Sequence, residues 1–136
     1  DINNLSPLKK TLAIAVINAL ANTCWNQGLI DENYRLERSK DPIDKVEIGV
    51  NSYSVIVGAL VPYIKQLINN DREFSILELD PSVLKSHELE YYLPPKKAAK
   101  VLPKADYVII TGTTLINDTL EELCWVSLSL SGRYLI

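Results

Sequence analysis

Residues 107–120 read YVIITGTTLINDTL, an apolar run that leads through a threonine-rich turn into a helical pattern. The run at 107–111 is continuously apolar and rich in β-branched residues, which is typical of a strand covered on both faces. Leu120, Leu123 and Cys124 then follow at helical spacing. The stretch therefore predicts a buried strand, a polar turn and a helix.

The same alternation extends on both sides of this stretch. Residues 53–60 (YSVIVGAL) and 74–79 (FSILEL) predict two further strands, and a fourth begins at residue 133. Helical spacing separates them at 64–68, at 96–102 and at 120–128. Strands that alternate with helices indicate βαβ units, whose right-handed crossovers build a parallel sheet. We predict an α/β fold, a Rossmann-like parallel sheet with flanking helices.

A separate helix precedes these units. Ser6 and Pro7 are a helix-start signal, in which a capping hydroxyl precedes proline in the first turn, and Gly28 marks the end. Apolar residues at 8, 12, 15, 16, 19 and 20 share one face, so we expect a well-buried helix. The polar residues 31–45 read as a connector, with a short helix after Pro42.

Composition limits the classes of function. The 136 residues carry a net charge of −3, which argues against nucleic acid and anionic membranes as partners, and no apolar run is long enough to span a membrane. Two cysteines are too few for a disulfide framework, so we expect free thiols in a cytoplasmic protein. The absence of Met and the end of the chain in mid-strand suggest a fragment. Homo-oligomerisation stays open.

Candidate site residues lie where the predicted strands end. In open parallel sheets, ligands bind beyond the carboxyl ends of the strands. Three segments should meet at that edge: Gly58 with Pro62, Glu78 with Asp80, and the loop 111–119. We therefore expect a small-molecule or metal ligand there.

The loop 111–119 has two interpretations. Gly112 permits a tight turn, and Thr111, Thr113, Thr114 and Asn117 supply short polar side chains. They could cap the next helix, as Asp118 with Glu121 would, or they could hold a ligand. Asp118, Glu121 and Glu122 bring up to three negative charges to this turn, and the loop contains no Lys or Arg. A polyphosphate is therefore disfavoured, and a hydroxyl-rich or metal-bearing ligand suits the loop better.

The acidic residues of the second segment also allow alternatives. Glu78 stands 20 residues after Gly58, a spacing at which a carboxylate can bind a ribose hydroxyl, but the turn GALVPY has one glycine where a dinucleotide site wants three. Glu78 and Asp80 flank Leu79 and could bind a divalent cation through oxygen. Alternatively, Asp80 only caps a turn. His87 reads as a surface residue.

The segments VIVGALVPYIKQL (55–67), ILELDPS (76–82) and ADYVIITGTTLINDTLEEL (105–123) resemble the putative heavy-metal chelation family. TLAIAVINALAN (11–22) is similar to the helix that precedes this domain in full-length members. The resemblance implies an enolase-like N-terminal subdomain, a Rossmann-like subdomain and a site in the cleft between them. It also implies heavy-metal chelation or transport, or a part in anaerobic cobalamin synthesis.

The resemblance carries over to single positions of this sequence. They are Gly58, Pro62, Glu78, Thr111, Gly112, Thr113, Thr114 and Asn117, with Asn18 from the preceding helix. Asp118 stands where many relatives have glycine. On this basis residues 1–45 are the helix and connector of a truncated N-terminal subdomain, and 46–136 are a Rossmann-like subdomain that is incomplete at its C-terminus.

Three hypotheses of function follow. The first is a domain that binds a small polar or metal-bearing ligand at the strand ends, with a divalent or heavy metal as the implied cofactor. The second is an enzyme that uses a nucleotide or S-adenosylmethionine, with Glu78 on a ribose. The third is a structural domain without ligand. Whether the protein is an enzyme is left open, because no catalytic arrangement can be assembled from these residues.

Overall fold

The computed structural model describes residues 6–29, 33, 48–128 and 134–135. Its sheet has five parallel strands in the order β3-β2-β1-β4-β5. The strands are β1 (Tyr53–Val57), β2 (Glu73–Leu77), β3 (Tyr92–Leu93), β4 (Tyr107–Ile110) and β5 (Tyr134–Leu135). The order reverses between β1 and β4, as in doubly wound Rossmann folds. The predicted fold class is therefore confirmed.

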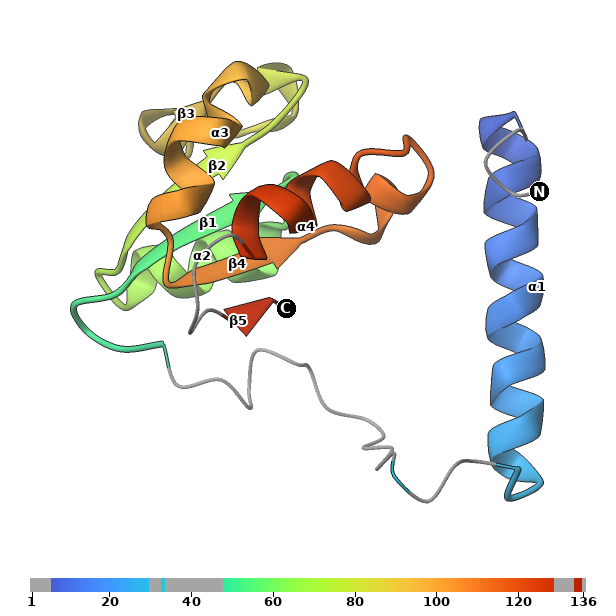
Figure 1. The fold of residues 1–136 in the computed structure, drawn as a ribbon. Coiled ribbons are helices and arrows are strands. Elements are labelled where there is room, and N and C mark those ends of the chain that lie inside the picture. Colours follow the sequence, from blue (N-terminus) through green and yellow to red (C-terminus); the bar gives the residue numbers. More distant parts are fainter. Residues whose placement is uncertain (1–5, 30–32, 34–47, 129–133, 136) are drawn as a thin grey trace.

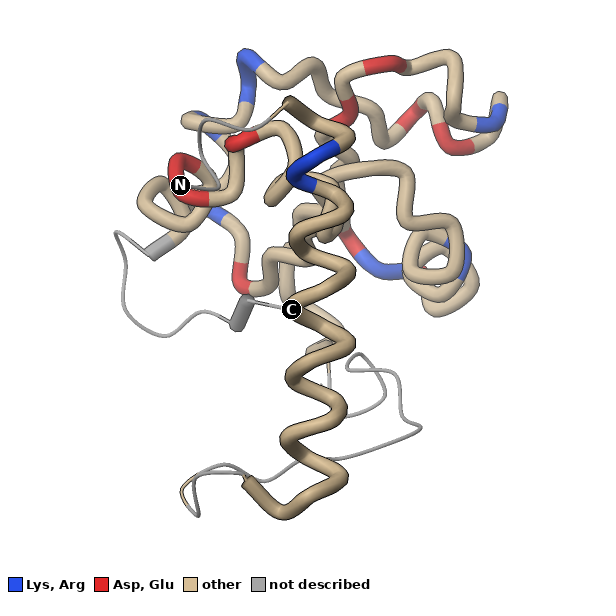
Figure 2. Tube along the Cα trace, turned by 90° about the vertical axis from the view of Figure 1, so that its right-hand side faces the viewer, with Lys and Arg blue, Asp and Glu red and all other residues tan. Residues whose placement is uncertain are grey.

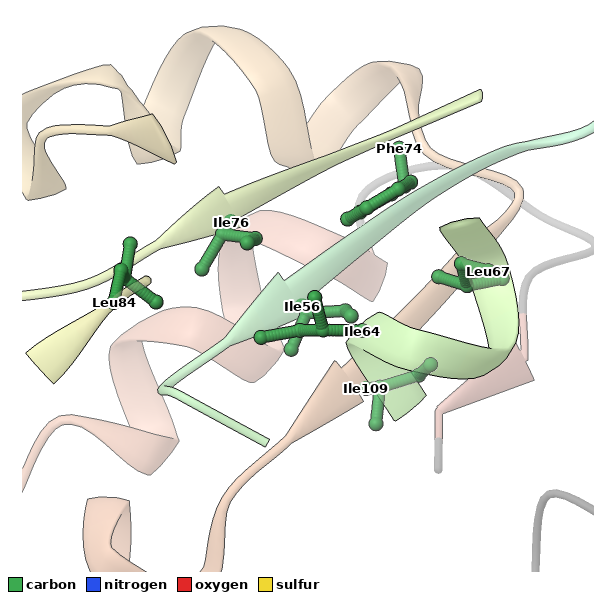
Figure 3. Close-up of a cluster of buried hydrophobic side chains, with 7 residues drawn as sticks. All are labelled: Ile56, Ile64, Leu67, Phe74, Ile76, Leu84 and Ile109. Carbon is green, nitrogen blue, oxygen red and sulfur yellow. The ribbon is translucent and has the colours of Figure 1, made fainter. Parts of the chain in front are cut away.

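Helices cover both faces of this sheet (Figure 1). On one face α2 (Val61–Asn69) packs against β1, β2 and β4, and Figure 3 shows its Ile64 and Leu67 against Ile56 of β1 and Ile109 of β4. On the other face α3 (Ala98–Val101) and α4 (Leu120–Leu128) cover Val55 and Val108. Strands buried on both faces must be apolar throughout, which explains the continuous apolar runs.

The segment between β2 and β4 is less regular than expected. The predicted helix at 96–102 is divided into the 3₁₀ turn Pro95–Lys97, α3, and the 3₁₀ turn Leu102–Lys104. Proline lies in the first turn of both 3₁₀ segments, where its missing N–H and its fixed backbone angle favour a short, tight turn. β3 was not predicted, because two residues carry no periodic pattern.

Glu88 is a fully buried carboxylate that the sequence did not indicate. Its Oε2 accepts a hydrogen bond of 2.8 Å from the Lys85 backbone N–H, and the Glu88 N–H donates to the Lys85 carbonyl at 2.8 Å. This reciprocal pair closes the turn before the 3₁₀ segment Leu89–Tyr91. The neighbouring His87 side chain is exposed, as predicted. The mostly polar stretch 85–90 (KSHELE) therefore contributes one residue, Glu88, to the interior.

α1 (Pro7–Asn26) begins and ends close to the predicted residues. Pro7 occupies the first turn, although the Ser6 side chain makes no capping bond, and Gly28 ends the helix with a φ of +73°. The expectation of a well-buried helix is wrong. Leu8, Leu12 and other apolar side chains of α1 are more than half exposed. The reason is that α1 stands beside the sheet rather than on it (Figure 1).

The charge distribution separates α1 from the rest of the described chain. Figure 2 shows Lys and Arg, Asp and Glu scattered over the sheet-bearing part, whereas α1 carries charge only near its N-terminal end. Among the described residues, no helix is both long and apolar enough to cross a membrane. The expected connector at 31–45 and the short helix after Pro42 fall almost wholly outside the described residues.

Candidate functional site

The carboxyl ends of β1, β2 and β4 border a pocket of about 280 Å³. Its floor and side are apolar and come from the strands, α3 and α4. Its other wall is the polar loop that follows β4. The lining residues are Val57, Gly58, Leu77, Glu78, Leu79, Pro95, Ala98, Ala99, Leu102, Thr111, Thr113, Thr114, Asn117, Thr119, Glu122, Leu123 and Val126. A concave apolar site with a few convergent polar groups is typical of small-molecule binding.

The structure brings together residues from all three predicted segments. Gly58, Glu78, Thr111, Thr113, Thr114 and Asn117 all line this one pocket. They come from the ends of three different strands, which the parallel topology places at one edge. The sequence positions alone are up to 59 residues apart, so the fold is what makes them neighbours.

The remaining predicted residues lie elsewhere. Asn18 is exposed on α1, and Pro62 lies in the first turn of α2 and does not line the pocket. Gly112 begins the 3₁₀ turn Gly112–Leu115 outside the pocket lining, and its backbone is not in the left-handed region. The turn out of β4 thus occurs at Gly112, as expected, without a backbone angle that favours glycine. That angle occurs at the end of β1, at Gly58.

Gly58 is fixed by its backbone and by its neighbour. Its φ of +100° lies in a region that side chains disfavour. A Cβ at this position would lie 2.7 Å from Cγ2 of Thr111, closer than real carbon contacts. The main chain leaving β1 can therefore lie against the end of β4 only because residue 58 has no side chain.

Glu78 follows the last residue of β2 and folds back on its own backbone. Its Oε1 accepts hydrogen bonds from the N–H of Leu79 at 2.7 Å and of Asp80 at 3.1 Å. The carboxylate is thus held in place at the edge of the pocket. The other oxygen of the carboxylate, Oε2, retains its capacity to accept hydrogen bonds.

Asp80 caps a turn, which was the alternative to metal binding for this residue. Its Oδ1 accepts a hydrogen bond of 2.9 Å from the N–H of Ser82 and caps the 3₁₀ turn Pro81–Val83. The side-chain and backbone hydrogen bonds from Ser82 hold the pKa of Asp80 below its usual value of 3.8. β2 ends at Leu77, so Glu78 and Asp80 are not on one face of a strand. Only Glu78 lines the pocket, so the predicted pairing of these two carboxylates on a metal is not supported by the geometry.

The threonines of the loop are largely engaged with one another. Thr111 caps the turn, with its Oγ1 accepting from Thr113. Thr114 is buried, and its hydroxyl donates to the Thr111 carbonyl at 2.7 Å. Both side chains thus bond within or next to the 3₁₀ turn Gly112–Leu115, and the described bonds of neither side chain cap α4. Thr113 is exposed and lines the pocket, and its hydroxyl, which donates to Oγ1 of Thr111 at 3.3 Å, keeps its oxygen to accept from a ligand.

Asn117 organises the entry to α4. Its Oδ1 accepts from the Thr119 hydroxyl at 2.6 Å and from the Thr119 N–H at 3.3 Å, a local turn typical of Asn. These bonds orient the side chain and leave its NH₂ group as a donor. Asp118 does not cap the helix as predicted. Its φ is +60°, and its carboxylate binds Lys10 of α1.

The ion pair between Lys10 and Asp118 joins α1 to the polar loop. The Lys10 side chain is 3% exposed and the Asp118 side chain 59% exposed. A buried ammonium without a partner is costly. The carboxylate therefore stabilises the contact between the N-terminal part of α1 and the loop that forms the pocket wall.

We predict that Asp118→Asn lowers the free energy of unfolding by about 1–3 kcal/mol, because it leaves the Lys10 ammonium with a neutral partner. Asn tolerates the left-handed backbone at position 118, so the change removes charge without adding strain. Urea denaturation measures the effect. Asp71→Asn is the matched control, since exposed Asp71 has a φ of +50°, and it should change stability by less than about 0.5 kcal/mol. Equal effects at both positions would contradict the role of the ion pair.

Several pocket residues were missed by the sequence interpretation. The apolar wall of Ala98, Ala99 and Leu102 comes from the segment 96–102, for which only a helix was predicted. Glu122 and Val126 come from α4. Their sequence signal is the ordinary spacing of a helix that packs on a sheet, which does not distinguish a pocket wall from a core contact.

The charge of the pocket limits its ligands. Among the described residues that line it there is no Lys, Arg or His, whereas Glu78 and Glu122 are carboxylates. Nothing in the lining therefore offsets the negative charge of a phosphate. The pocket favours a neutral or cationic ligand with hydrogen-bonding groups.

The pocket residues do not fit a soft heavy metal. Such ions prefer thiolate and imidazole ligands, and the polar groups of the pocket are carboxylates, hydroxyls and an amide. Cys24 is exposed on α1, and Cys124 lies on α4 outside the lining. Within the described ranges, no group of three or more His, Cys, Asp or Glu residues could hold a metal ion.

Comparison with known proteins places the chain in a family. A family model described as putative heavy-metal chelation matches residues 41–129. An uncharacterised protein of Methanocaldococcus jannaschii is 28% identical over 116 residues, which are 84% of this chain and 40% of that protein. This chain therefore spans less than half the length of that relative.

Two solved structures of family members, both of unknown function, are similar. The protein from Pyrococcus horikoshii has a TM-score of 0.69 at 18% identity, over 96% of this chain and 48% of that one. The protein from Desulfitobacterium hafniense has a TM-score of 0.47 at 27% identity, over 64% of this chain and 33% of that one. The first likeness supports the fold described above.

Proposed function

This chain belongs to the putative heavy-metal chelation family, and from this premise we propose that its Rossmann-like part binds a small, phosphate-free polar molecule at the carboxyl ends of β1, β2 and β4. The observation that carries the proposal is that Gly58, Glu78 and the loop after β4 all line the same pocket. Its polar wall and its apolar wall face a common space. Such a space suits a ligand with one hydrogen-bonding side and one apolar side.

The polar wall supplies a limited set of groups to that ligand. The Thr113 hydroxyl, whose proton is directed at Thr111, accepts, the NH₂ group of Asn117 donates, and the fixed carboxylate of Glu78 accepts. The last of these bonds is charge-assisted and is stronger than a bond to the hydroxyl or the amide. Ligand hydroxyl or amino groups should therefore be directed at Glu78.

The family description suggests a metal, and this proposal includes only cations that prefer oxygen ligands. Glu78 and Glu122 provide oxygen, which suits magnesium, calcium or manganese better than a soft metal. A bound ligand that carries such a cation would be held through these carboxylates. Chelation of a soft metal by the pocket side chains alone is not part of the proposal.

We also propose that residues 1–45 belong to a second subdomain, as the resemblance implies. Exposed apolar side chains along α1 support this, since the longer relatives contain additional chain that could cover them. The ion pair of Lys10 with Asp118 would then couple that subdomain to the wall of the pocket.

The test is a thermal-shift screen of the chain against sugars, amino acids, nucleosides and divalent metals. We predict a shift with a phosphate-free polar compound and a five- to tenfold weaker affinity in Thr113→Val, since one hydrogen bond contributes about 1 kcal/mol. Thr23→Val is the matched control, because Thr23 is exposed on α1 and bonds only within its helix, to the Ala19 carbonyl at 3.0 Å. It should leave the affinity unchanged.

Two results would contradict the proposal. One is an affinity that falls equally in Thr113→Val and Thr23→Val, which would place the ligand elsewhere. The other is a shift with zinc, cadmium or nickel alone that survives Glu78→Gln. A soft metal would then bind through residues outside the pocket.

A further inference from the structure

The fold places Glu78 where doubly wound sheets bind a ribose. The sheet order reverses between β1 and β4, and the pocket lies at the ends of these strands and of β2. In this topology an acidic residue at the end of the second strand accepts hydrogen bonds from sugar hydroxyls. Glu78 directly follows β2 (Glu73–Leu77) and lines the pocket. The spacing noticed in the sequence therefore corresponds to a position in space.

The carboxylate of Glu78 is prepared for such a contact. Both of its described hydrogen bonds go to Oε1, from the N–H groups of Leu79 and Asp80. They fix the orientation of the group before a ligand arrives, which reduces the entropy lost on binding. Oε2 is left to accept from a pair of neighbouring hydroxyl groups.

The turn after β1 offers few of the backbone donors that bind phosphate. In dinucleotide sites the pyrophosphate lies on free backbone N–H groups at the start of the next helix. Here the Leu60 N–H donates to the Gly58 carbonyl at 2.9 Å, and the Val61 N–H donates to the Ala59 carbonyl at 3.0 Å. Pro62 has no N–H at all. At positions 60 to 62, the donors that would hold a phosphate are therefore engaged or absent.

The remaining walls suit a flat ring. Pro95, Ala98 and Ala99 present small apolar groups on one side of the pocket, and Leu79 lies beside Glu78. The NH₂ group of Asn117 can donate to a ring nitrogen or a carbonyl. A planar heterocycle could thus lie against the apolar side while its sugar reaches Glu78.

We propose that the ligand of this pocket is a nucleoside, or a molecule bound through its nucleoside part, without phosphate at this site. Glu78 accepts hydrogen bonds from the ribose hydroxyls, and the apolar wall covers the base. This inference rests on the proposed function and narrows the class of ligand. It gives Pro62, which lies outside the pocket, a role in excluding phosphate from the start of α2.

The test is a titration of the full chain with adenosine, guanosine, cytidine and uridine by calorimetry. The nucleoside that binds best is then compared with its 2′,3′-dideoxy form and its 5′-monophosphate. We expect the dideoxy form to bind roughly 10- to 100-fold more weakly, because it lacks the groups that donate to Glu78. The monophosphate should also bind more weakly than the nucleoside.

Variants assign the effect to Glu78. In Glu78→Gln the nucleoside should lose affinity by a similar factor, while the dideoxy form should bind as it does to the unchanged protein. Glu73→Gln is the matched control, since exposed Glu73 begins the same strand at its opposite end and the change removes the same charge. It should alter neither affinity.

Three results would overturn the inference. They are equal binding of the nucleoside and its dideoxy form, tighter binding of the monophosphate, and no binding of any nucleoside. If the last result came with a Thr113-dependent shift from a sugar or an amino acid, the pocket would still bind a polar ligand. Absence of every Thr113-dependent shift would overturn the proposed function as well.

Discussion

Gly58→Ala is expected to lower the free energy of unfolding by about 2–6 kcal/mol, the largest effect on stability of any substitution considered for this protein. The backbone at Gly58 has a φ of +100°, which a residue with a side chain adopts only with strain. The new methyl group would also lie 2.7 Å from Cγ2 of Thr111. Strain and overlap act together, so the ends of β1 and β4 must move apart. Urea denaturation measures the loss.

Two variants separate these causes. Gly112→Ala is the matched control, because nothing lies within 4 Å of a Cβ at Gly112 and its backbone is ordinary. It should change stability by less than about 0.5 kcal/mol. Adding Thr111→Ser to Gly58→Ala removes the overlapping Cγ2 and should recover about 1–2 kcal/mol. If Gly58→Ala matched Gly112→Ala, the close approach of the two strand ends would be disproved.

Ala99→Phe is expected to weaken ligand binding by at least about 100-fold, whatever the ligand is, because a large side chain enters a pocket of only about 280 Å³. Ala99 is exposed, so the protein should tolerate the change without a large loss of stability. The measurement is the affinity for the compound that gives the greatest thermal shift, by calorimetry.

A matched change on α1 provides the control for this prediction. Ala15 is likewise an exposed alanine of a helix, and Ala15→Phe adds the same side chain away from the strand ends. It should leave the affinity within about twofold of the original. Full binding by Ala99→Phe would show that the ligand does not occupy the space between α3, α4 and the strands.

Local patterns predicted the sheet because its central strands are buried on both faces. Continuous apolar runs around Ile56, Ile76 and Val108 are what such burial requires, and all three side chains are buried in the structure. The predicted strand ends at residues 60 and 79 lie too far along the chain, since Gly58 and Glu78 belong to turns rather than to strands. β3 escaped notice because two paired residues leave no periodic signal.

The exposure of α1 could not be predicted from its own sequence. A helix with an apolar face is interpreted as buried, yet whether that face is covered depends on contacts with residues distant in sequence. The burial of Glu88 was equally hidden, because its bond to the Lys85 backbone forms only when the turn closes. The exposure of α1 and the burial of Glu88 both depend on contacts that local composition does not encode.

The candidate site was predicted in outline because topology brings strand ends together. Gly58, Glu78 and Thr113 line one pocket, as expected of parallel strands. Which hydroxyls remain available could not be foreseen, since Thr111 and Thr114 bond within the loop. The pairing of Asp118 with Lys10 depends on the placement of α1. Sequence thus indicated which strand ends border the pocket, and three-dimensional contacts decide which polar groups there are already hydrogen-bonded.

The most direct test of the central claim is to follow the backbone amide resonances of the chain by NMR during titration with the compound that gives the greatest thermal shift. The account predicts that the largest chemical-shift changes occur at the amides of Gly58, Glu78, Thr113 and Asn117, which line the pocket. They should be absent at Glu73 and along α1 beyond Lys10. Changes centred on α1 or on the start of β2, with the pocket amides unmoved, would contradict a binding site at the strand ends.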